Sequence, residues 1–456
     1  MAFSATLVVG CVKVEIDDSS STTNNGGGTG TGGTLQERII SSKIITGNIN
    51  EIVELPKGKY TLKGYVFVTE RATLRFAPGS IILSDTLQKG ALIVERNSRL
   101  FADGTAAEPI IFTSGKPAGR RVPGDWGGIV LLGNAPTNRS TTPTIEGGIN
   151  SQYGGSVVAD NSGILRYVRI EYAGIAADPG SEINGLTCGG VGSGTVLENI
   201  QVTYGNDDAY EFFGGTVNAK NLVAFATADD DFDFDFGYVG RIQFGISLRD
   251  PAFVDGGDAG NGIECDNDGS GTAALPRTRP VLSNFTLCGA NMATTGPAAN
   301  HNFANRWRRS TQFVFRNSIL MGYPKGGLVL ESNLTAQSFL NDSSAFRHNL
   351  VHAVVEPYKV SGIIAPTVIT AADVKAKAEG VDSCKTYAAS ADIMLENAFN
   401  LAAPNFTPKA GSPAIAPNAA SFVGLPNFTV VTYAGAIGTS NWLQGWTSFT
   451  PQTNVY

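Results

Sequence analysis

The chain has 456 residues, with 33 Lys and Arg against 40 Asp and Glu, which gives a net charge of −7. Without a basic stripe to neutralise phosphates, this balance excludes a general nucleic-acid binder. Charged residues make up only 16% of the chain and Gly reaches 55 residues, a combination typical of an all-β protein with many tight corners.

The N-terminal residues form a short apolar stretch, Ala2 to Gly10, that stops at Cys11. The Leu-Val-Val-Gly before this cysteine resembles the lipobox of bacterial lipoproteins. The resemblance implies a signal remnant over residues 1–11, a lipidated Cys11, and an outer-membrane, cell-surface location; the alternative is an apolar N-terminus with an incidental cysteine. Residues 12–34 are first acidic and then rich in Gly, Ser and Thr, and they are predicted to form a flexible tether because they bury too little apolar surface to offset their ordering entropy.

From residue 59 to about residue 355, short apolar strands alternate with Gly, Asn and Asp. Related segments begin at Glu198, Lys220 and Arg241, spaced 22 and 21 residues apart, and several consist of a polar residue, an Asn and alternating apolar positions. A strand-rich repeat of about 20 to 25 residues indicates a solenoid, because one coil cannot bury its own apolar face. The period excludes a propeller and the motif excludes leucine-rich repeats, which leaves a parallel β-helix.

Three segments carry a family resemblance: GDWGGIVLLG at 124–133, EFFGGTVN at 211–218 and GSPAI at 411–415. They resemble right-handed β-helix lipoproteins of Gram-negative bacteria, which have the pectin-lyase-like superfold. The resemblance implies an all-β, right-handed parallel β-helix solenoid, expected here over residues 35–365, and it implies no particular reaction.

After residue 355 the composition changes. Helix formers at 371–379 and 391–401 predict short helices within a lateral excursion over residues 366–405. Residues 406–456 are predicted to form a C-terminal coil and cap, because the open end of a solenoid must be covered. The aromatic residues expected in this cap are Trp442, Trp446 and Phe449.

Acidic residues gather at the ends of two successive predicted coils. The offset from Asp207 to Asp229 is 22 residues, equal to the coil period, so the two side chains are expected to stack. Strand alternation predicts that Asp231, Asp233 and Asp235 share one face, with the intervening Phe residues in the core. Carboxylates this close raise one another's pKa or require a cation.

Three interpretations of this cluster remain open. In the first it binds Ca²⁺, which prefers several carboxylate and carbonyl oxygens. In the second it is catalytic, because Asn206-Asp207-Asp208 is similar to the Asp pair of polygalacturonase-like glycosidases, although the Gly-His-Gly and Arg-Ile-Lys motifs of that family are missing. In the third, Asp and Asn only cap the turns of the coils. The candidate metal ligands are Asp229, Asp231, Asp233, Asp235, Glu264, Asp266 and Asp268, and the candidate catalytic residues are Asp207, Asp208, Asp230 and Asp231.

Other polar residues give weaker signals. A lyase would need a cationic base, for which Arg241 is the nearest candidate in sequence. Arg306, Trp307 and Arg308 could grip an anionic sugar through charge and stacking, or pack along a coil edge with solvated heads. An even number of cysteines beyond Cys11 predicts two disulfides, of which Cys265–Cys288 is favoured because the two are about one coil apart. The other two are Cys188 and Cys384.

The sequence therefore predicts a surface lipoprotein whose β-helix binds a polysaccharide or an outer-membrane protein partner and is stabilised by calcium. One alternative is a carbohydrate-active enzyme, a hydrolase or lyase that uses the stacked Asp residues. The other is a purely structural or adhesive surface protein. An acidic cluster exposed in a groove would favour the first two functions, and bonds to turn amides alone would favour the third.

Overall fold

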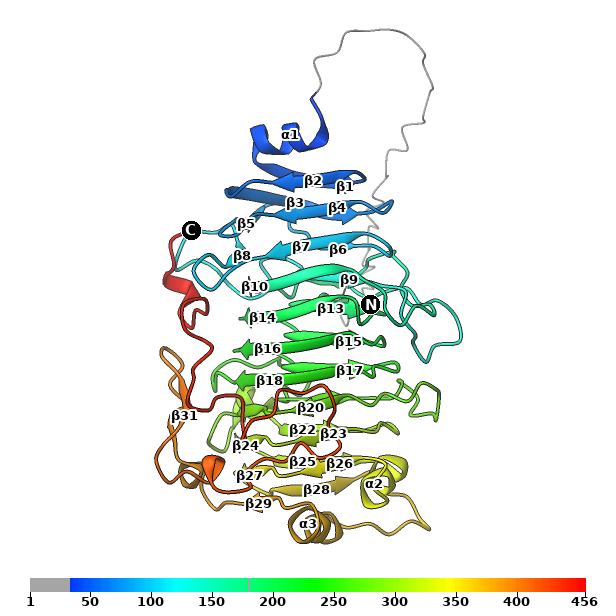
Figure 1. The fold of residues 1–456 in the computed structure, drawn as a ribbon, viewed down its shortest axis with the longest axis vertical. Coiled ribbons are helices and arrows are strands. Elements are labelled where there is room, and N and C mark those ends of the chain that lie inside the picture. Colours follow the sequence, from blue (N-terminus) through cyan, green and yellow to red (C-terminus); the bar gives the residue numbers. More distant parts are fainter. Residues whose placement is uncertain (1–32, 179–180) are drawn as a thin grey trace, which may run out of the picture.

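Parallel strands stack coil upon coil into one long column (Figure 1). The structure, a computed structural model, describes residues 33–178 and 181–456. Cys11 and nearly all of the predicted tether lie outside these residues. Among the residues described, no helix combines the length and apolar character needed to cross a bilayer.

The column has three faces, each a parallel sheet. Face 1 contains β2 (Ile52–Leu55), β4 (Thr73–Phe76), β7 (Arg99–Asp103), the first halves of β10 (Gly163–Glu171), β14 (Val196–Thr203), β16 (Asn218–Phe225) and β18 (Arg241–Leu248), then β20 (Val281–Ser283), β23 (Val314–Arg316) and β26 (Ala345–Arg347). Face 2 contains the first halves of β1 (Ile44–Ile49) and β3 (Lys59–Val68), β5 (Ile81–Ser84), β8 (Ile110–Ser114), the second halves of β10, β14, β16 and β18, then β21 (Thr286–Cys288), β24 (Ile319–Tyr323), β27 (Leu350–Ala353) and β29 (Lys385–Thr386). Face 3 contains the second halves of β1 and β3, then β6 (Leu92–Val94), β9 (Ile129–Leu132), β13 (Leu186–Gly189), β15 (Tyr210–Phe213), β17 (Phe232–Asp235), β19 (Glu264–Cys265), β22 (Phe303–Trp307), β25 (Gly326–Glu331) and β28 (Tyr358–Ser361).

The core consists of inward side chains that stack on the equivalent residues of the next coil. Tyr210 pairs with Phe232, 22 residues later, and their ring centroids lie 5.1 Å apart. Phe212 and Phe234 repeat the arrangement at 5.3 Å. The 22-residue spacing in the sequence is therefore the coil period, and the predicted parallel β-helix is confirmed.

The bend between face 1 and face 2 explains the recurring Asn. Asn199 and Asn221 occupy the same corner of neighbouring coils with φ of 54° and 58°. Asn tolerates this left-handed conformation better than most residues. The Asn221 amide also donates a hydrogen bond to Asn199 Oδ1 at 3.4 Å, so the corner side chains bond to one another along the column. The same corner is made on other coils by Tyr167, Phe244, Asn284, Asn317 and His348.

Helices close both ends of the column (Figure 1). At the N-terminal end, α1 (Leu35–Ser42) begins with a Thr34 capping box and buries Ile39 in the core. At the other end, α3 (Ala371–Gly380) buries Val374 and Ala378 in the same core, beyond the shorter helix α2 (Asn333–Leu340) on the side. The predicted helix over 371–379 is therefore present, but it covers the end of the solenoid rather than projecting laterally.

The prediction of a helix over 391–401 is wrong. That segment contains the 3₁₀ turn η2 (Ser390–Ile393) and the strand β30 (Leu395–Asn397), which pairs antiparallel with β31 (Asn405–Pro408). Burial of Ile393 and Leu395 against face 2 accounts for this irregular path. Smaller elements elsewhere are β11 (Ala176–Asp178), β12 (Ser181–Glu182), η1 (Gly296–Asn300), η3 (Pro413–Ile415) and η4 (Pro451–Thr453).

Residues 421–456, here called the tail, lie along the side of the column and return toward its N-terminal end (Figure 1). The predicted C-terminal cap is thus a lateral strap. The tail takes this lateral path because the outward surface of face 2 is apolar and would otherwise be exposed, whereas α3 already covers the end of the column. Trp446 packs edge-to-face on Tyr167, and Phe449 packs edge-to-face on Phe225.

The predicted disulfides are absent from the described residues, because Cys188, Cys265, Cys288 and Cys384 are all free and buried. Cys265 lies on face 3, where it pairs with Trp307, whereas Cys288 lies on face 2, where it pairs with Met321. The 23-residue offset between them includes a loop, so the two cysteines do not occupy equivalent positions on adjacent coils.

Candidate metal centre

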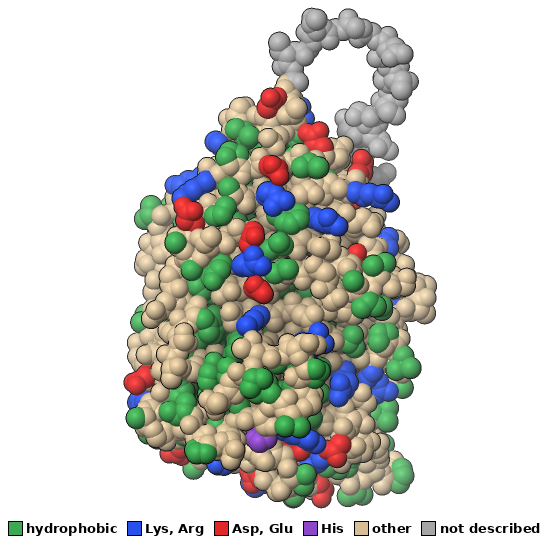
Figure 2. Space-filling model, viewed as in Figure 1, with side chains coloured by type: hydrophobic (Ala, Val, Ile, Leu, Met, Phe, Trp, Pro, Cys, Tyr) green, Lys and Arg blue, Asp and Glu red, His purple; other side chains and the backbone are tan. Residues whose placement is uncertain are grey.

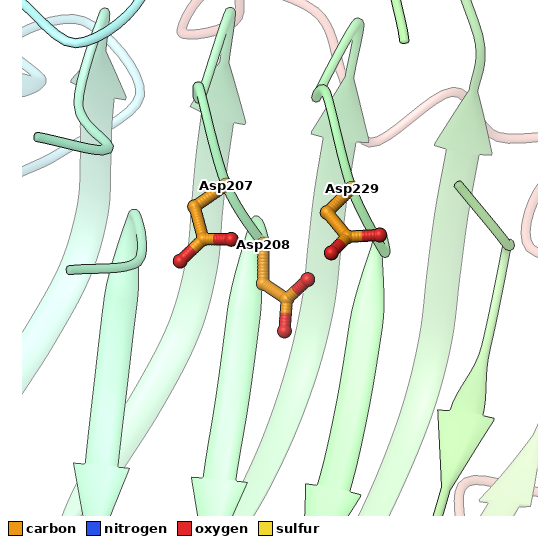
Figure 3. Close-up of side chains that lie close together, drawn as sticks. All are labelled: Asp207, Asp208 and Asp229. Carbon is orange, nitrogen blue, oxygen red and sulfur yellow. The ribbon is translucent and has the colours of Figure 1, made fainter. Parts of the chain in front are cut away.

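The acidic residues gather where the chain turns from face 2 into face 3. Asp207 and Asp208 precede β15, and Asp229 occupies the same turn one coil later, before β17 (Figure 3). One carboxylate oxygen from each of the three residues lies within 4.8 Å of the others. The coil period therefore brings together side chains that are 22 residues apart.

These side chains line a cavity of about 260 Å³. Its wall contains ten carboxylates, one amide and one guanidinium. Turns and strands of face 3 supply most of them, the loop between β9 and β10 supplies Glu146, and the loop between β10 and β13 supplies Glu182. The lining residues are Glu146, Glu182, Asn184, Asp207, Asp208, Glu211, Asp229, Asp230, Asp233, Asp258, Glu264 and Arg308.

A second group of three ligand atoms lies beside the first. Oxygens of Asp208, Glu211 and Asp233 also lie within 4.8 Å of one another, so the two groups share Asp208. Glu211 and Asp233 are register partners in β15 and β17, with side chains on the outer surface of the sheet. Glu211 was not among the predicted ligands, although the motif Asp-Asp-x-x-acid occurs at 207–211 and again at 229–233. From this repeated motif, the position of Glu211 beside Asp233 could have been predicted.

Part of the cluster also caps turns. Asp208 Oδ1 accepts a hydrogen bond from the backbone N–H of Asp230 at 2.8 Å. Asp230 Oδ1 accepts one from the backbone N–H of Asn261 at 2.6 Å. Each of these carboxylates thus holds the following coil with one oxygen, as the turn-capping interpretation expects.

Asn184 is the amide that lines the same cavity. Its side chain is 1% exposed and its amide NH₂ donates to Glu211 and, at 3.3 Å, to Glu146. Its Oδ1 has no hydrogen-bond partner among the described residues. A buried polar atom without a partner is costly, and a neutral amide oxygen among carboxylates is a ligand that hard cations accept.

Burial and mutual repulsion disfavour full ionisation of the cavity. Burial, followed by the neighbouring carboxylates, raises the pKa of Asp208 and Asp230 well above the usual range. Burial raises the pKa of Glu264 to about 8, even though Arg308 and Arg306 pull it down. The cavity must therefore retain protons or take up positive charge from outside.

The predicted metal ligands are divided by the structure. Asp229, Asp233 and Glu264 line the cavity. Asp266 does not, because Arg308 and Arg309 hold it at 2.9 and 2.6 Å. The remaining members outside the lining are Asp231, Asp235 and Asp268.

Asp231 was expected to share a face with Asp233, and this is wrong. β17 begins one residue later, at Phe232, so Asp231 belongs to the turn and its side chain points into the column. There it is fully buried and pairs with Arg249 at 3.1 Å. Phe236 also departs from the alternation: at φ 47° it leaves the strand and stacks outside on Phe213, not in the core.

Asp268 caps its own loop by accepting backbone N–H bonds from Ser270 at 2.9 Å and Thr272 at 3.1 Å. This tight loop accounts for the calcium-loop-like pattern in the sequence. Asp235 lies on β17, and its Oδ1 has no hydrogen-bond partner among the described residues.

The structure also divides the candidate catalytic and sugar-binding residues. Asp207, Asp208 and Asp230 line the cavity, and Asp231 does not. Arg241 lies on face 1, away from the cavity, so Arg308 is the cation that lines it.

The structure contradicts the interpretation in which Trp307 stacks on a sugar. Alternation along β22 turns its ring inward, where it is fully buried and stacks on Phe313 with centroids 4.2 Å apart. Arg306 and Arg308, which flank it, point outward and both pair with Glu264. Their charges are therefore committed to neighbouring carboxylates rather than free for a ligand.

The fold and the cavity together define a parallel β-helix protein with a concentrated acidic site on one face. The chain belongs to the family described as pectate-lyase like β-helix domain, whose family model matches residues 47–394. Among solved structures, the crystal structure of pectate lyase Pel9A is similar, with 13% sequence identity, a TM-score of 0.44 and coverage of 91% of this chain and 95% of that one. No curated protein matches the chain.

Proposed function

We propose that the chain is a calcium-binding β-helix protein of the cell surface that presents its faces to an extended glycan or to a partner protein. The observation that carries the cation is the cavity, in which ten carboxylates face one guanidinium. Carboxylates buried at this density stay ionised at neutral pH only when positive charge compensates them.

Calcium is favoured over other cations by the donor set. Ca²⁺ takes six to eight oxygen ligands in flexible geometry, whereas Mg²⁺ demands a near-ideal octahedron and keeps several of its waters. The two groups that share Asp208 offer five carboxylates. No Cys or His lines the cavity, so the softer ligands that zinc favours are not among its donors.

The surface location is supported by the likeness of the residues before Cys11 to a lipobox. Lipid on Cys11 would hold the column at the outer membrane, beyond a tether of polar residues. The long lateral faces of a solenoid suit extended ligands, which supports a glycan or an outer-membrane protein as the partner.

A carbohydrate-active enzyme is the second candidate. Asp207, Asp208 and Asp230 lie in one cavity and their pKa values are raised, mainly by burial, so that one can hold a proton while another is ionised. That division of protons is what general acid–base cleavage of a glycosidic bond needs. For elimination the base would have to come from Arg308, whose charge Glu264 and Asp266 already engage.

Calorimetric titration of the metal-free protein with calcium at pH 7.5 tests the first proposal. We expect saturable binding that Asp208→Asn weakens at least tenfold, because both groups of ligands lose a shared oxygen. Asp268→Asn is the matched control, since Asp268 caps a loop outside the cavity, and it should bind calcium like the wild type. Absence of saturable binding would refute a calcium site.

The enzymatic candidate needs a separate assay. Purified protein is incubated with polygalacturonate, with and without calcium, while reducing ends and unsaturated products are followed. Release of either product that Asp208→Asn abolishes would establish catalysis at the cavity. Calcium binding without any product would leave the binding function.

A further inference from the structure

A second groove, of about 300 Å³, lies on face 1 and shares no residue with the acidic cavity. Its floor is formed by the first halves of β14, β16 and β18, and one wall is formed by tail residues 427–429. Gln243 fixes this wall, because its side chain accepts a hydrogen bond from the Thr429 N–H at 2.8 Å and donates to the Thr429 carbonyl at 2.7 Å. The groove is therefore shaped before any ligand binds.

On the N-terminal side of this groove, face 1 carries a row of ion pairs. Figure 2 shows acidic and basic side chains alternating in a file down this side of the column. Arg166 lies between Asp103 and Glu198, at 2.8 and 3.1 Å. Lys220 and Arg241 follow on the next two coils, and neither forms an ion pair with any carboxylate that the structure describes.

Other groups contact mainly Lys220, whose Nζ lies over the Phe244 ring, 5.6 Å from its centroid. Lys220 Nζ donates to Thr429 Oγ1 at 3.0 Å, and the Arg241 guanidinium makes no hydrogen bond to a described residue. Glu198 also lines the groove, but Arg166 engages its carboxylate, so Lys220 and Arg241 leave an excess of positive charge that favours an anion. Because a guanidinium presents a planar fork of donors, it suits a carboxylate.

The rest of the groove has the mixed character of a sugar site. The half-buried Phe428 ring and the side chain of Val196 offer apolar surface. Asn218 accepts the Arg241 backbone N–H at 3.1 Å through Oδ1, which leaves its NH₂ for a hydroxyl. Apolar walls with a few polar groups are typical of small-molecule sites of this size.

We propose that this groove binds the carboxylate-bearing unit of an acidic saccharide. Arg241 and Lys220 hold the carboxylate, the Asn218 amide bonds a ring hydroxyl, and Phe428 packs against the apolar side of the pyranose. The inference gives a chemical class to the glycan in the proposed function and rests on that part of it. It is independent of calcium, because the groove contains none of the cavity residues.

The test is binding of methyl β-D-glucuronide to the full chain, measured by saturation-transfer NMR and calorimetry in the presence of a chelator. Methyl β-D-glucoside and acetate serve as the neutral sugar and the bare carboxylate. We expect millimolar or tighter binding of the glucuronide, at least tenfold stronger than either comparison ligand, which corresponds to about 1.4 kcal/mol.

Variants assign the binding to the groove. Arg241→Gln should lower glucuronide affinity at least tenfold, and Phe428→Ala should weaken the glucuronide and leave acetate unchanged. Lys59→Gln, which removes an exposed cation of β3 at the N-terminal end of the column, is the matched control and should have no effect. Thermal unfolding of each variant confirms that it is folded.

Each contrary result has a distinct meaning. Equal affinity for acetate and the glucuronide reduces the groove to a simple anion site and overturns the proposal, as does no binding at about 20 mM ligand. If glucuronide binds but Arg241→Gln changes nothing, glycan binding survives and this groove is refuted as its location. If the glucuronide binds while calcium does not, only the calcium part of the proposed function fails.

Discussion

Asp208 and Asp230 occupy the same turn on neighbouring coils, and the Asp208 carboxylate accepts the Asp230 backbone N–H at 2.8 Å. One oxygen of Asp208 therefore holds the next coil in place, while the residue also belongs to both groups of potential ligands. Turn capping and cation binding are thus compatible functions of a single side chain. This dual use accounts for a dense carboxylate cluster in a region where the backbone must stay in register.

The stability of the metal-free protein should fall as pH rises. Because burial raises the pKa of the cavity carboxylates in the folded state, the folded protein keeps protons that the unfolded chain has already lost. The free energy of unfolding then decreases with pH, and for Glu264 this occurs between its ordinary 4.5 and about 8.

The measurement is thermal unfolding at a series of pH values, with a chelator and with calcium. We expect the melting temperature to decline between pH 5 and pH 8 in chelator, and calcium to reverse the decline at pH 8 because the bound ion stabilises the ionised form. A melting temperature that rises with pH in chelator would contradict the raised pKa values.

Asp231→Asn and Asp233→Asn should have opposite signatures. Asp231→Asn leaves the buried Arg249 without its ion-pair partner, which costs about 3 to 5 kcal/mol, and the stabilisation by calcium should persist. Asp233→Asn removes a cavity carboxylate, so the calcium effect should shrink, while stability in chelator should rise because repulsion is relieved.

Denaturant unfolding with and without calcium compares the two variants directly. The assignment of Asp231 to the interior would be wrong if its variant lost the calcium response and kept the stability of the wild type. Glu54→Gln, on the exposed surface of face 1, is a suitable control and should change neither quantity by more than about 0.5 kcal/mol.

Asn317 holds the corner between faces 1 and 2 and also anchors the tail. Its φ is 56°, its amide donates to Ser283 at 3.0 Å and to the Ser421 carbonyl at 3.1 Å, and it accepts the Ser421 N–H at 2.8 Å. Asn317→Ala should destabilise the protein by about 3 to 5 kcal/mol, through these bonds and the left-handed backbone.

Asn317→Gly loses the same bonds but accepts the backbone conformation, so urea unfolding should find it about 1 kcal/mol more stable than the Ala variant. Equal stability of the two variants would show that the corner conformation carries no cost.

The buried cysteines should behave as thiols. Alkylation of the native protein should be slow at Cys188, Cys265, Cys288 and Cys384, whose pKa values burial raises. Alkylation in denaturant without reductant should label all four, as followed by peptide mass spectrometry. A pair that reacts only after reduction would identify a disulfide.

Much of the fold follows from repetition in the sequence. The spacing of Glu198 and Lys220 is the register of β14 and β16, and the recurrent Asn marks the corner residues. The stacking of Asp207 on Asp229 follows from the same period, since each coil adds nearly the same number of residues. Where the period holds, sequence offset translates directly into spatial contact.

Prediction failed where a residue lies in a turn or an insertion. Strand alternation was extended to Asp231, which precedes β17 and turns inward. Glu146 and Glu182 reach the cavity from two loops, before and after β10, whose lengths have no relation to the coil period.

The sequence contains one indication that a segment covers the side of the column. Residues 222–225 read Leu-Val-Ala-Phe and are apolar at every position, which indicates a strand buried on both sides. The inner side faces the core of the column and the outer side faces the tail. Such continuous apolar runs on one face of a solenoid predict a covering segment, although they do not reveal which part of the chain supplies it.

The tail also changes how the column assembles. In a simple solenoid each coil contacts only its neighbours, so stability is a sum of local terms and folding can spread from any point. Here Arg121 donates a hydrogen bond to the carbonyl of Pro451, 330 residues away, and Gln201 donates to the carbonyl of Ser448. Early coils therefore depend on residues synthesised much later, and such distant closure makes folding slow and the unfolding of separate coils interdependent.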